Sequence, residues 1–188
     1  DGLYTGFVVD AKTRAVIAQK VENVYFGKPC GLMDQMASSV GGMVTIDFKE
    51  QDAKVEAIAC NFAAKGYALC VVNTGGDHGD LTDDYAAIRK EMEAVAAHFG
   101  KHVLREVELE TVESHVGELR RACGDRAVLR AIHYFEENAR TLAQRDALQA
   151  GQFDAFAALV LESGRASFAL CQNVYCSTDV RHQGLSVA

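Results

Sequence analysis

Apolar residues recur at helical spacing in the first part of the chain. Over residues 10–26, DAKTRAVIAQKVENVYF, four apolar side chains share one face of a predicted helix: Ile17, Val21, Val24 and Tyr25. Asp10 stands where an N-cap residue is expected, because its carboxylate can accept from the free amides of the first turn. The turn sequence GKPCG follows, and LMDQMASSV at 32–40 predicts a short second helix.

The pattern then changes to short runs rich in β-branched and aromatic residues. Such runs, separated by polar residues or glycine, are typical of strands. They predict three strands, GGMVTIDF at 41–48, KVEAIAC at 54–60 and GYALCVVNT at 66–74. The loop GGDHGD then leads back to helical spacing.

The remainder of the chain is predicted to be helical. The first of these helices ends at Gly100 and is marked by five residues on one face: Tyr85, Ile88, Met92, Val95 and Phe99. Two further helices are predicted over 111–122 and 126–149, and one or two more over 152–173, broken near Gly164. Three strands followed by four or five helices predict an α+β protein.

Composition narrows the class of protein. The formal net charge of −7 disfavours a nucleic-acid surface, and no apolar run reaches the roughly 18 residues of a membrane span. The six cysteines form no CxxC pair, which favours reduced thiols and a cytoplasmic location. Cys171 and Cys176 have no second ligand pair at a zinc spacing. The last residues, QGLSVA, read as the start of another helix, so the chain is expected to be a fragment of a longer protein.

The segment ENVYFGKPCGLMDQ, residues 22–35, carries a resemblance to a known family. With PCGLMDQ at its centre, it resembles galactokinases, which belong to the GHMP sugar kinase superfamily. Further segments resemble the same family in the same order, so the resemblance covers nearly the whole chain: NTGGDHGDLTDDYAAIRKEM at 73–92, RAIHYFEENAR at 130–140, LESGRASF at 161–168 and NVYCSTDVRHQGLSVA at 173–188. The resemblance implies a GHMP-kinase-like fold. Residues 1–48 would form the end of the N-terminal lobe, and 49–188 the first part of a ferredoxin-like C-terminal lobe.

The resemblance also implies a set of site residues. Asp34 matches the catalytic aspartate beside the C1 hydroxyl of galactose, Gly31 and Tyr85 match sugar-contacting positions, and Glu22 matches a ligand of Mg²⁺. Phosphoryl transfer from ATP needs an acceptor hydroxyl that is oriented in line and relieved of its proton, which suits a fixed carboxylate. Pro29, the only proline in the chain, is expected to fix the turn that aims Asp34.

Each of these residues has a structural alternative. Asp34 alone could cap a helix, Glu22 could be an exposed helical residue, and Tyr85 could be a core aromatic. His78 is explained equally well by a glycine-rich turn, and Cys30 is expected to be a packed small residue. A charged face of the helix over 126–149 is interpreted as structural: Arg130, His133, Glu137 and Arg140.

The sequence also departs from the family. The N-terminal sugar clamp, the glycine- and serine-rich phosphate loop and the C-terminal glycine-rich motif have no counterpart in these residues. The parent protein is therefore expected to be an active kinase that uses galactose, ATP and Mg²⁺. The fragment alone is expected to be inactive and to self-associate through exposed apolar faces. Two alternatives stay open: an N-acetylgalactosamine kinase, and a galactose sensor that performs little or no chemistry.

Overall fold

The computed structural model describes residues 6, 8–27, 30–50, 52–75, 82–176, 179–181 and 183–188. The chain divides into two compact units, Asp1–Cys60 and Asn61–Ala188, and each is described by itself. Within the described residues the structure is mostly helical, with one small sheet of two strands. The predicted mixture of helices and strands is therefore present, with helices dominant.

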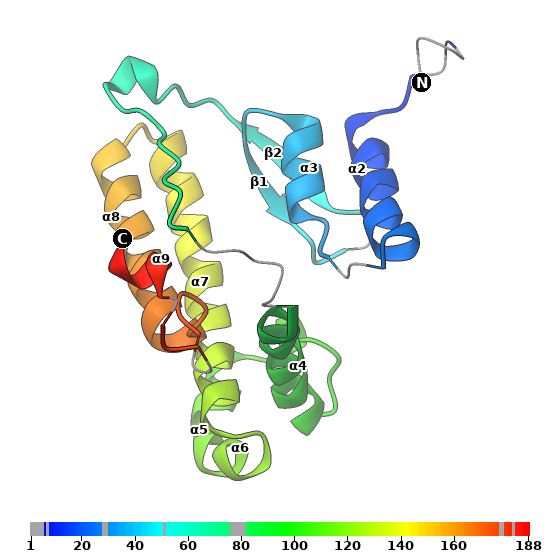
Figure 1. Cartoon of the computed structure of the whole chain (residues 1–188), viewed down its shortest axis with the longest axis vertical. Coiled ribbons are helices and arrows are strands. Elements are labelled where there is room, and N and C mark those ends of the chain that lie inside the picture. Colours follow the sequence, from blue (N-terminus) through cyan, green and yellow to red (C-terminus); the bar gives the residue numbers. More distant parts are fainter. Residues whose placement is uncertain are drawn as a thin grey trace. The chain divides into compact units, whose positions relative to one another are not determined.

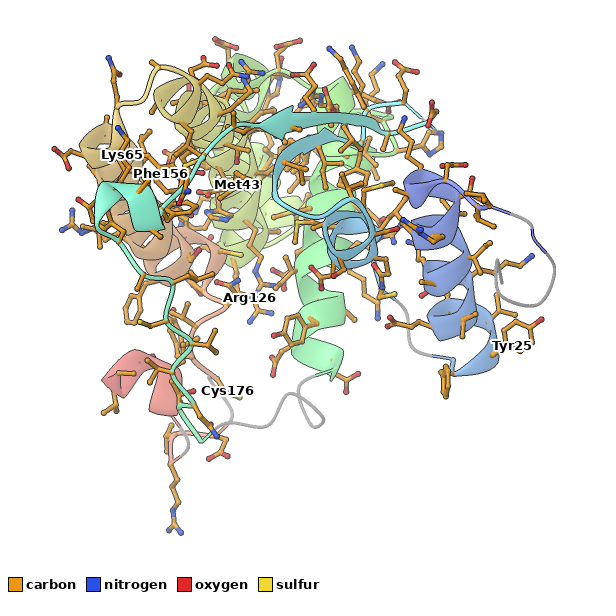
Figure 2. All side chains as sticks on the ribbon, turned by 90° about the horizontal axis from the view of Figure 1, so that it is seen from above. Tyr25, Met43, Lys65, Arg126, Phe156 and Cys176 are labelled. Carbon is orange, nitrogen blue, oxygen red and sulfur yellow. The ribbon has the colours of Figure 1, made fainter. Side chains whose placement is uncertain are left out.

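The first described helix of this unit is α2, Ala11–Lys20, which lies within the helix predicted over 10–26. Asp10 caps this helix because its carboxylate accepts from the Thr13 backbone amide at 3.0 Å and from the Thr13 hydroxyl at 2.6 Å. The helix widens into a π-helical turn over Val21–Tyr25. Several of the apolar positions predicted on one face are largely exposed, with Tyr25 at 78% (labelled in Figure 2).

The second helix and the sheet complete this unit. α3, Met33–Val40, ends at Gly41 and Gly42, which both adopt positive φ angles that side-chain-bearing residues rarely take. The chain then enters β1, Met43–Asp47, which pairs antiparallel with β2, Lys54–Ile58, in a register that places Met43 opposite Ile58. α2 and α3 pack together (Figure 1). A small buried core forms around Ala15, Met36 and Ala53.

The prediction of a third strand over residues 66–74 is wrong. The structure describes this segment as irregular, and Leu69 and Val71 are 93% and 95% exposed. β-branched residues favour a strand only where a neighbouring strand supplies backbone hydrogen bonds and a surface to pack on. Among the described residues this segment has no strand partner, because the sheet contains β1 and β2 alone.

The helices that the structure describes in the second unit follow the predicted order. They are α4 at Thr82–His98, α5 at Leu109–Ser114, α6 at Val116–Ala122, α7 at Asp125–Gln149, α8 at Phe153–Ala166 and α9 at Gly184–Val187. Short 3-10 turns cover Ala63–Lys65 and Leu104–Glu106, and a π-helical turn covers Ser167–Cys171. The π-helical turn lies inside the helical region predicted over 152–173, whereas the two 3-10 turns lie outside the predicted helices and strands.

Two predicted helix boundaries need correction. The helix predicted over 111–122 is divided at His115, so α5 and α6 are separate. Gly164 does not break α8, and the change of helix type comes at Ser167 instead. An isolated glycine weakens a helix by about 1 kcal/mol relative to alanine, which neighbouring turns and packing against α7 can offset.

The core of the second unit lies where α4, α5, α6 and α7 meet. Val95, Val112, Leu119 and Ala131 have no exposed surface there. α8 packs along α7, and the turn around Lys65 lies beside Phe156 of α8, where the rings of Phe62 and Phe156 are 6.1 Å apart (Figure 2). The helices are thus held by apolar contacts on one side of α7 and by aromatic contacts near α8.

The charged face of α7 is structural, as predicted, but it is largely buried. Arg130 is 2% exposed and His133 is 8% exposed. Arg130 donates to Glu91 of α4 at 2.8 Å and to the Cys171 carbonyl at 2.9 Å, and Glu137 accepts from Ser163 of α8. These polar contacts join α7 to α4, to α8 and to the π-helical turn.

The six cysteines, all among the described residues, form no disulfide. In the part of the chain that the structure describes, the helices are too short or too polar to span a bilayer.

Candidate functional site

Asp34 lies in the first turn of α3 with an exposed side chain. The first amides of a helix have no partner within the helix, so a carboxylate near this end is favoured electrostatically. The short helix also fixes the direction in which the side chain leaves the backbone. Asp34 is therefore held on a regular element while remaining accessible to a ligand.

A pair of side-chain amides holds the turn before Asp34. Asn23 accepts from the Cys30 backbone amide at 2.8 Å and donates to the Cys30 carbonyl at 3.3 Å. Gln19 donates to the same carbonyl at 3.2 Å. We call Gln19 and Asn23 the amide clamp. The clamp ties the turn to α2 and its π-helical extension, so the start of α3 is fixed from the preceding helix.

Two sequence predictions fall outside the described residues. They concern Pro29, expected to fix the turn, and His78, interpreted as part of a glycine-rich turn. Cys30 is partly buried, and its Sγ lies 3.4 Å from the amide nitrogen of Gln35. That position agrees with the prediction of a packed small residue.

Glu22 and Asp34 line the same cavity. The cavity has a volume of about 580 Å³ and lies wholly within the first unit. Glu22 is partly buried and accepts from the side-chain amide of Gln35 at 3.0 Å. The described residues that line the cavity come from α2 and its π-helical extension, from the turn at Cys30 and from α3: Arg14, Ala15, Ala18, Glu22, Cys30, Asp34, Gln35, Ser38 and Ser39.

Arg14 supplies a positive charge to this lining. Its guanidinium donates to the Ser39 hydroxyl and to the Ser39 carbonyl, both at 3.3 Å. The Ser39 hydroxyl in turn donates to the Ala11 carbonyl at 2.8 Å. The cavity therefore carries two carboxylates and one guanidinium, and the guanidinium is oriented by contacts between α2 and α3.

Gly31 leaves open space beside the turn. A Cβ atom built at this position would meet no other atom within 4 Å, so the fold itself does not require glycine there. The prediction that Gly31 allows close approach of a sugar is compatible with this space and stays a prediction. Tyr85 belongs to the second unit, where it is 53% exposed near the start of α4. Its role as a sugar contact also stays a prediction, although its exposure disfavours the alternative of a core aromatic.

The cavity supplies some, but not all, of the ligands that a hard divalent cation needs. Carboxylate and amide oxygens are the ligands that Mg²⁺ prefers, and Mg²⁺ commonly uses one or two carboxylates together with water and substrate phosphates. Glu22 and Asp34 supply two carboxylates, and Oε1 of Gln35 is a buried acceptor without a partner among the described residues. No group of three or more histidine, cysteine or acidic side chains gathers at one point in the described ranges. The lining could thus hold a cation that is shared with a phosphate ligand.

Sequence reasoning missed the amide clamp and Gln35. A weak signal was present, because Gln19 and Asn23 are four residues apart and therefore share a face of the predicted first helix. Nothing in the sequence indicated that this face meets the Cys30 turn. The contact of Gln35 with Glu22 joins residues 13 positions apart and depends on the packing of α2 against α3.

Comparisons with known proteins give matches to galactokinases. The chain is 33% identical over 152 residues to the galactokinases of Glaesserella parasuis serovar 5 and Mannheimia succiniciproducens. Each of these alignments covers 79% of this chain and 38% of the relative. It is 34% identical over 139 residues to the galactokinase of Actinobacillus pleuropneumoniae, with 72% of this chain and 35% of that relative covered. No protein-family model matches the chain.

The chain thus spans a little over a third of the length of the curated relatives it matches. The resemblance to galactokinases that the sequence indicated is confirmed.

Proposed function

We propose that the protein containing this chain is an ATP-dependent galactokinase, which transfers the γ-phosphate of ATP to the C1 hydroxyl of galactose. The observation that carries the proposal is the cavity that brings Asp34 and Glu22 of the galactokinase-like segment together. The similarity to galactokinases over most of the chain supports it.

Each site residue has a role that follows from its chemistry. Asp34 accepts a hydrogen bond from the sugar hydroxyl and takes its proton as the phosphoryl group is transferred. Gly31 leaves room for the sugar beside the turn, and Tyr85 contacts the sugar. Glu22 holds Mg²⁺, which when bound neutralises charge on the phosphate oxygens. Arg14 is placed to balance the charge of the two carboxylates when no ligand is present.

The GHMP-kinase fold is part of the same proposal. Residues 1–48 would belong to the N-terminal lobe and 49–188 to a ferredoxin-like C-terminal lobe. A cytoplasmic location, inactivity of the isolated chain and its self-association stay predictions. Exposed apolar side chains such as Leu69 and Val71 are compatible with self-association.

Replacing Asp34 tests the proposed chemistry. In the full-length protein, Asp34→Asn is nearly isosteric, and we expect turnover of galactose to fall by roughly 10²–10⁴-fold because a positioned proton acceptor contributes about that much. The KM for galactose should change less, since asparagine still accepts a hydrogen bond. The matched control is Asp52→Asn, which removes an exposed carboxylate paired with Lys12 at 3.0 Å. It should leave turnover unchanged.

The same assay separates the alternatives when it is run with galactose and with N-acetylgalactosamine. If the protein phosphorylates N-acetylgalactosamine and not galactose, it is an N-acetylgalactosamine kinase. Binding of galactose and ATP without turnover in the wild-type protein would favour a sensor. An Asp34→Asn variant that keeps more than about half of wild-type turnover would show that Asp34 does not accept the proton.

A further inference from the structure

The side chain of Gln35 connects the two halves of the cavity. It leaves α3 at the position after Asp34, and its amide nitrogen donates to Oε1 of Glu22 at 3.0 Å. Glu22 lies in the π-helical turn that extends α2. The same amide nitrogen lies 3.4 Å from Sγ of Cys30 in the turn between these elements. One amide group therefore contacts the helix before the turn and the turn itself.

The chemistry of the contact fixes the orientation of the amide. An ionised carboxylate only accepts hydrogen bonds, so the Gln35 nitrogen must face Glu22 and the oxygen must face away from it. That oxygen, Oε1, is buried and has no hydrogen-bond partner among the described residues. A buried acceptor without a partner destabilises the folded state unless a ligand or water completes it. Gln35 thus presents a donor to Glu22 and an unfilled acceptor in the lining of the same cavity.

We infer that Gln35 is a positioning residue, which holds the carboxylate of Glu22 in the orientation that binds a divalent cation. The inference rests on the proposed role of Glu22 as a ligand of Mg²⁺. Carboxylates that ligate metals are commonly hydrogen-bonded by a second residue, which limits their rotation and leaves one oxygen directed at the cation. Here Oε1 of Glu22 accepts from Gln35, and Oε2 remains for the metal.

The position of Glu22 explains why its carboxylate needs a hydrogen-bond partner that orients it. Glu22 stands on a π-helical turn with no described ion pair to restrain its long side chain. A glutamate that samples several rotamers loses conformational entropy on binding a cation, and a hydrogen bond made beforehand reduces that loss. Since Gln35 follows Asp34 directly, the same short helix places both the catalytic carboxylate and the group that orients the metal ligand.

The test measures metal binding apart from turnover. In the full-length protein with a non-hydrolysable ATP analogue, Mn²⁺ replaces Mg²⁺ and its free concentration is read by electron paramagnetic resonance. Gln35→Met keeps the length of the side chain and removes the donor, and we expect it to weaken Mn²⁺ binding by roughly 10–100-fold. Gln149→Met, at the exposed end of α7, is the matched control and should bind Mn²⁺ as the wild type does.

A double-mutant cycle separates positioning through Glu22 from a general structural effect. Glu22→Gln should weaken Mn²⁺ binding by itself, and Gln35→Met should then add less than about threefold, because the two residues act on one contact. The KM for galactose at saturating metal should stay within about twofold of the wild type in Gln35→Met. Circular dichroism checks folding, and Gln35→Asn, whose shorter amide does not reach Glu22, replaces Gln35→Met if the latter does not fold.

The outcomes distinguish this inference from the proposed function. Wild-type Mn²⁺ affinity in a folded Gln35 variant overturns the inference, as does a full additional loss in the Glu22→Gln background. A wild-type protein that binds Mn²⁺ with the ATP analogue but does not phosphorylate galactose contradicts the proposed function, and weaker Mn²⁺ binding in Gln35→Met then still supports the role of Gln35. A wild-type protein that binds no Mn²⁺ under these conditions overturns the role of Glu22 and this inference together.

Discussion

Replacing Glu91 should destabilise the second unit more than replacing any exposed acid of the same helix. Glu91 of α4 accepts from Arg130 at 2.8 Å and from Arg126 at 2.6 Å, both on α7. The side chain of Arg130 is only 3% exposed, so its charge depends on Glu91 and on the Cys171 carbonyl for compensation. Arg126 is more accessible and is labelled in Figure 2. The change that tests this network is Glu91→Gln, which removes the charge and keeps the shape.

The expected loss in the free energy of unfolding follows from how deeply each ion pair of Glu91 is buried. A hydrogen bond to a buried charged group contributes about 1.5–3 kcal/mol, and the amide of glutamine replaces it only in part. The pair with Arg126 is nearer the surface and contributes about 0.5 kcal/mol. The free energy of unfolding should therefore fall by about 2–3 kcal/mol. For a chain of this size that corresponds to a decrease in Tm of roughly 5–10 °C.

Urea unfolding followed by far-UV circular dichroism measures the loss. The matched control is Glu93→Gln on the same helix, which breaks the exposed pair with Arg89 at 2.7 Å and should change the free energy of unfolding by less than about 0.5 kcal/mol. The double variant Glu91→Met with Arg130→Met should recover part of the loss, because no buried charge is left uncompensated. If Glu91→Gln unfolds within about 0.5 kcal/mol of the wild type, the buried charge network does not stabilise the unit as reasoned.

Three further predictions concern other parts of the chain. Met36→Ala should lower the free energy of unfolding of the first unit by about 2–5 kcal/mol in urea titrations, because Met36 is fully buried against Ala15, and an unchanged midpoint would contradict this. Burial lowers the pKa of His133 below its ordinary value of 6.5, with Glu137, Arg140 and Glu136 nearby. The unfolded chain therefore binds more protons, so stability should decrease as the pH falls below about 6.5, and His133→Gln should reduce this dependence in unfolding measured from pH 7.5 to 5. Gly184→Ala should displace α9, since a Cβ there would lie 2.3 Å from the Thr74 carbonyl oxygen, and unchanged hydrogen exchange of residues 184–187 would refute it.

The sequence alone determined the local elements of this protein. Helical spacing of apolar residues located α2, α4 and α7, and Asp10 marked the start of α2 through its capping chemistry. The glycine pair after residue 40 marked the end of α3, because few other residues adopt the backbone angles found there. These features depend on neighbours in the chain, so they can be read without knowing the fold.

Only the tertiary structure decided which segments became strands and which charges are buried. Residues 66–74 have the composition of a strand but no described partner, and strand formation depends on pairing. Arg126 and Arg130 lie one turn apart on α7 and both contact Glu91 of α4. Arg130 also donates to the Cys171 carbonyl in the Ser167–Cys171 turn and is 3% exposed, whereas the side chain of Arg126 is 40% exposed.

In the candidate site, too, some features follow from the local sequence and others depend on tertiary packing. The segment ENVYFGKPCGLMDQ identified Glu22 and Asp34 as candidates, since a short sequence motif is enough to mark a resemblance. The amide clamp and the contact of Gln35 became visible only in the folded structure, because the clamp joins α2 and its π-helical extension to the Cys30 turn and Gln35 joins α3 to Glu22. Local sequence thus determined which groups are present, and the packing of two helices decided how they are held.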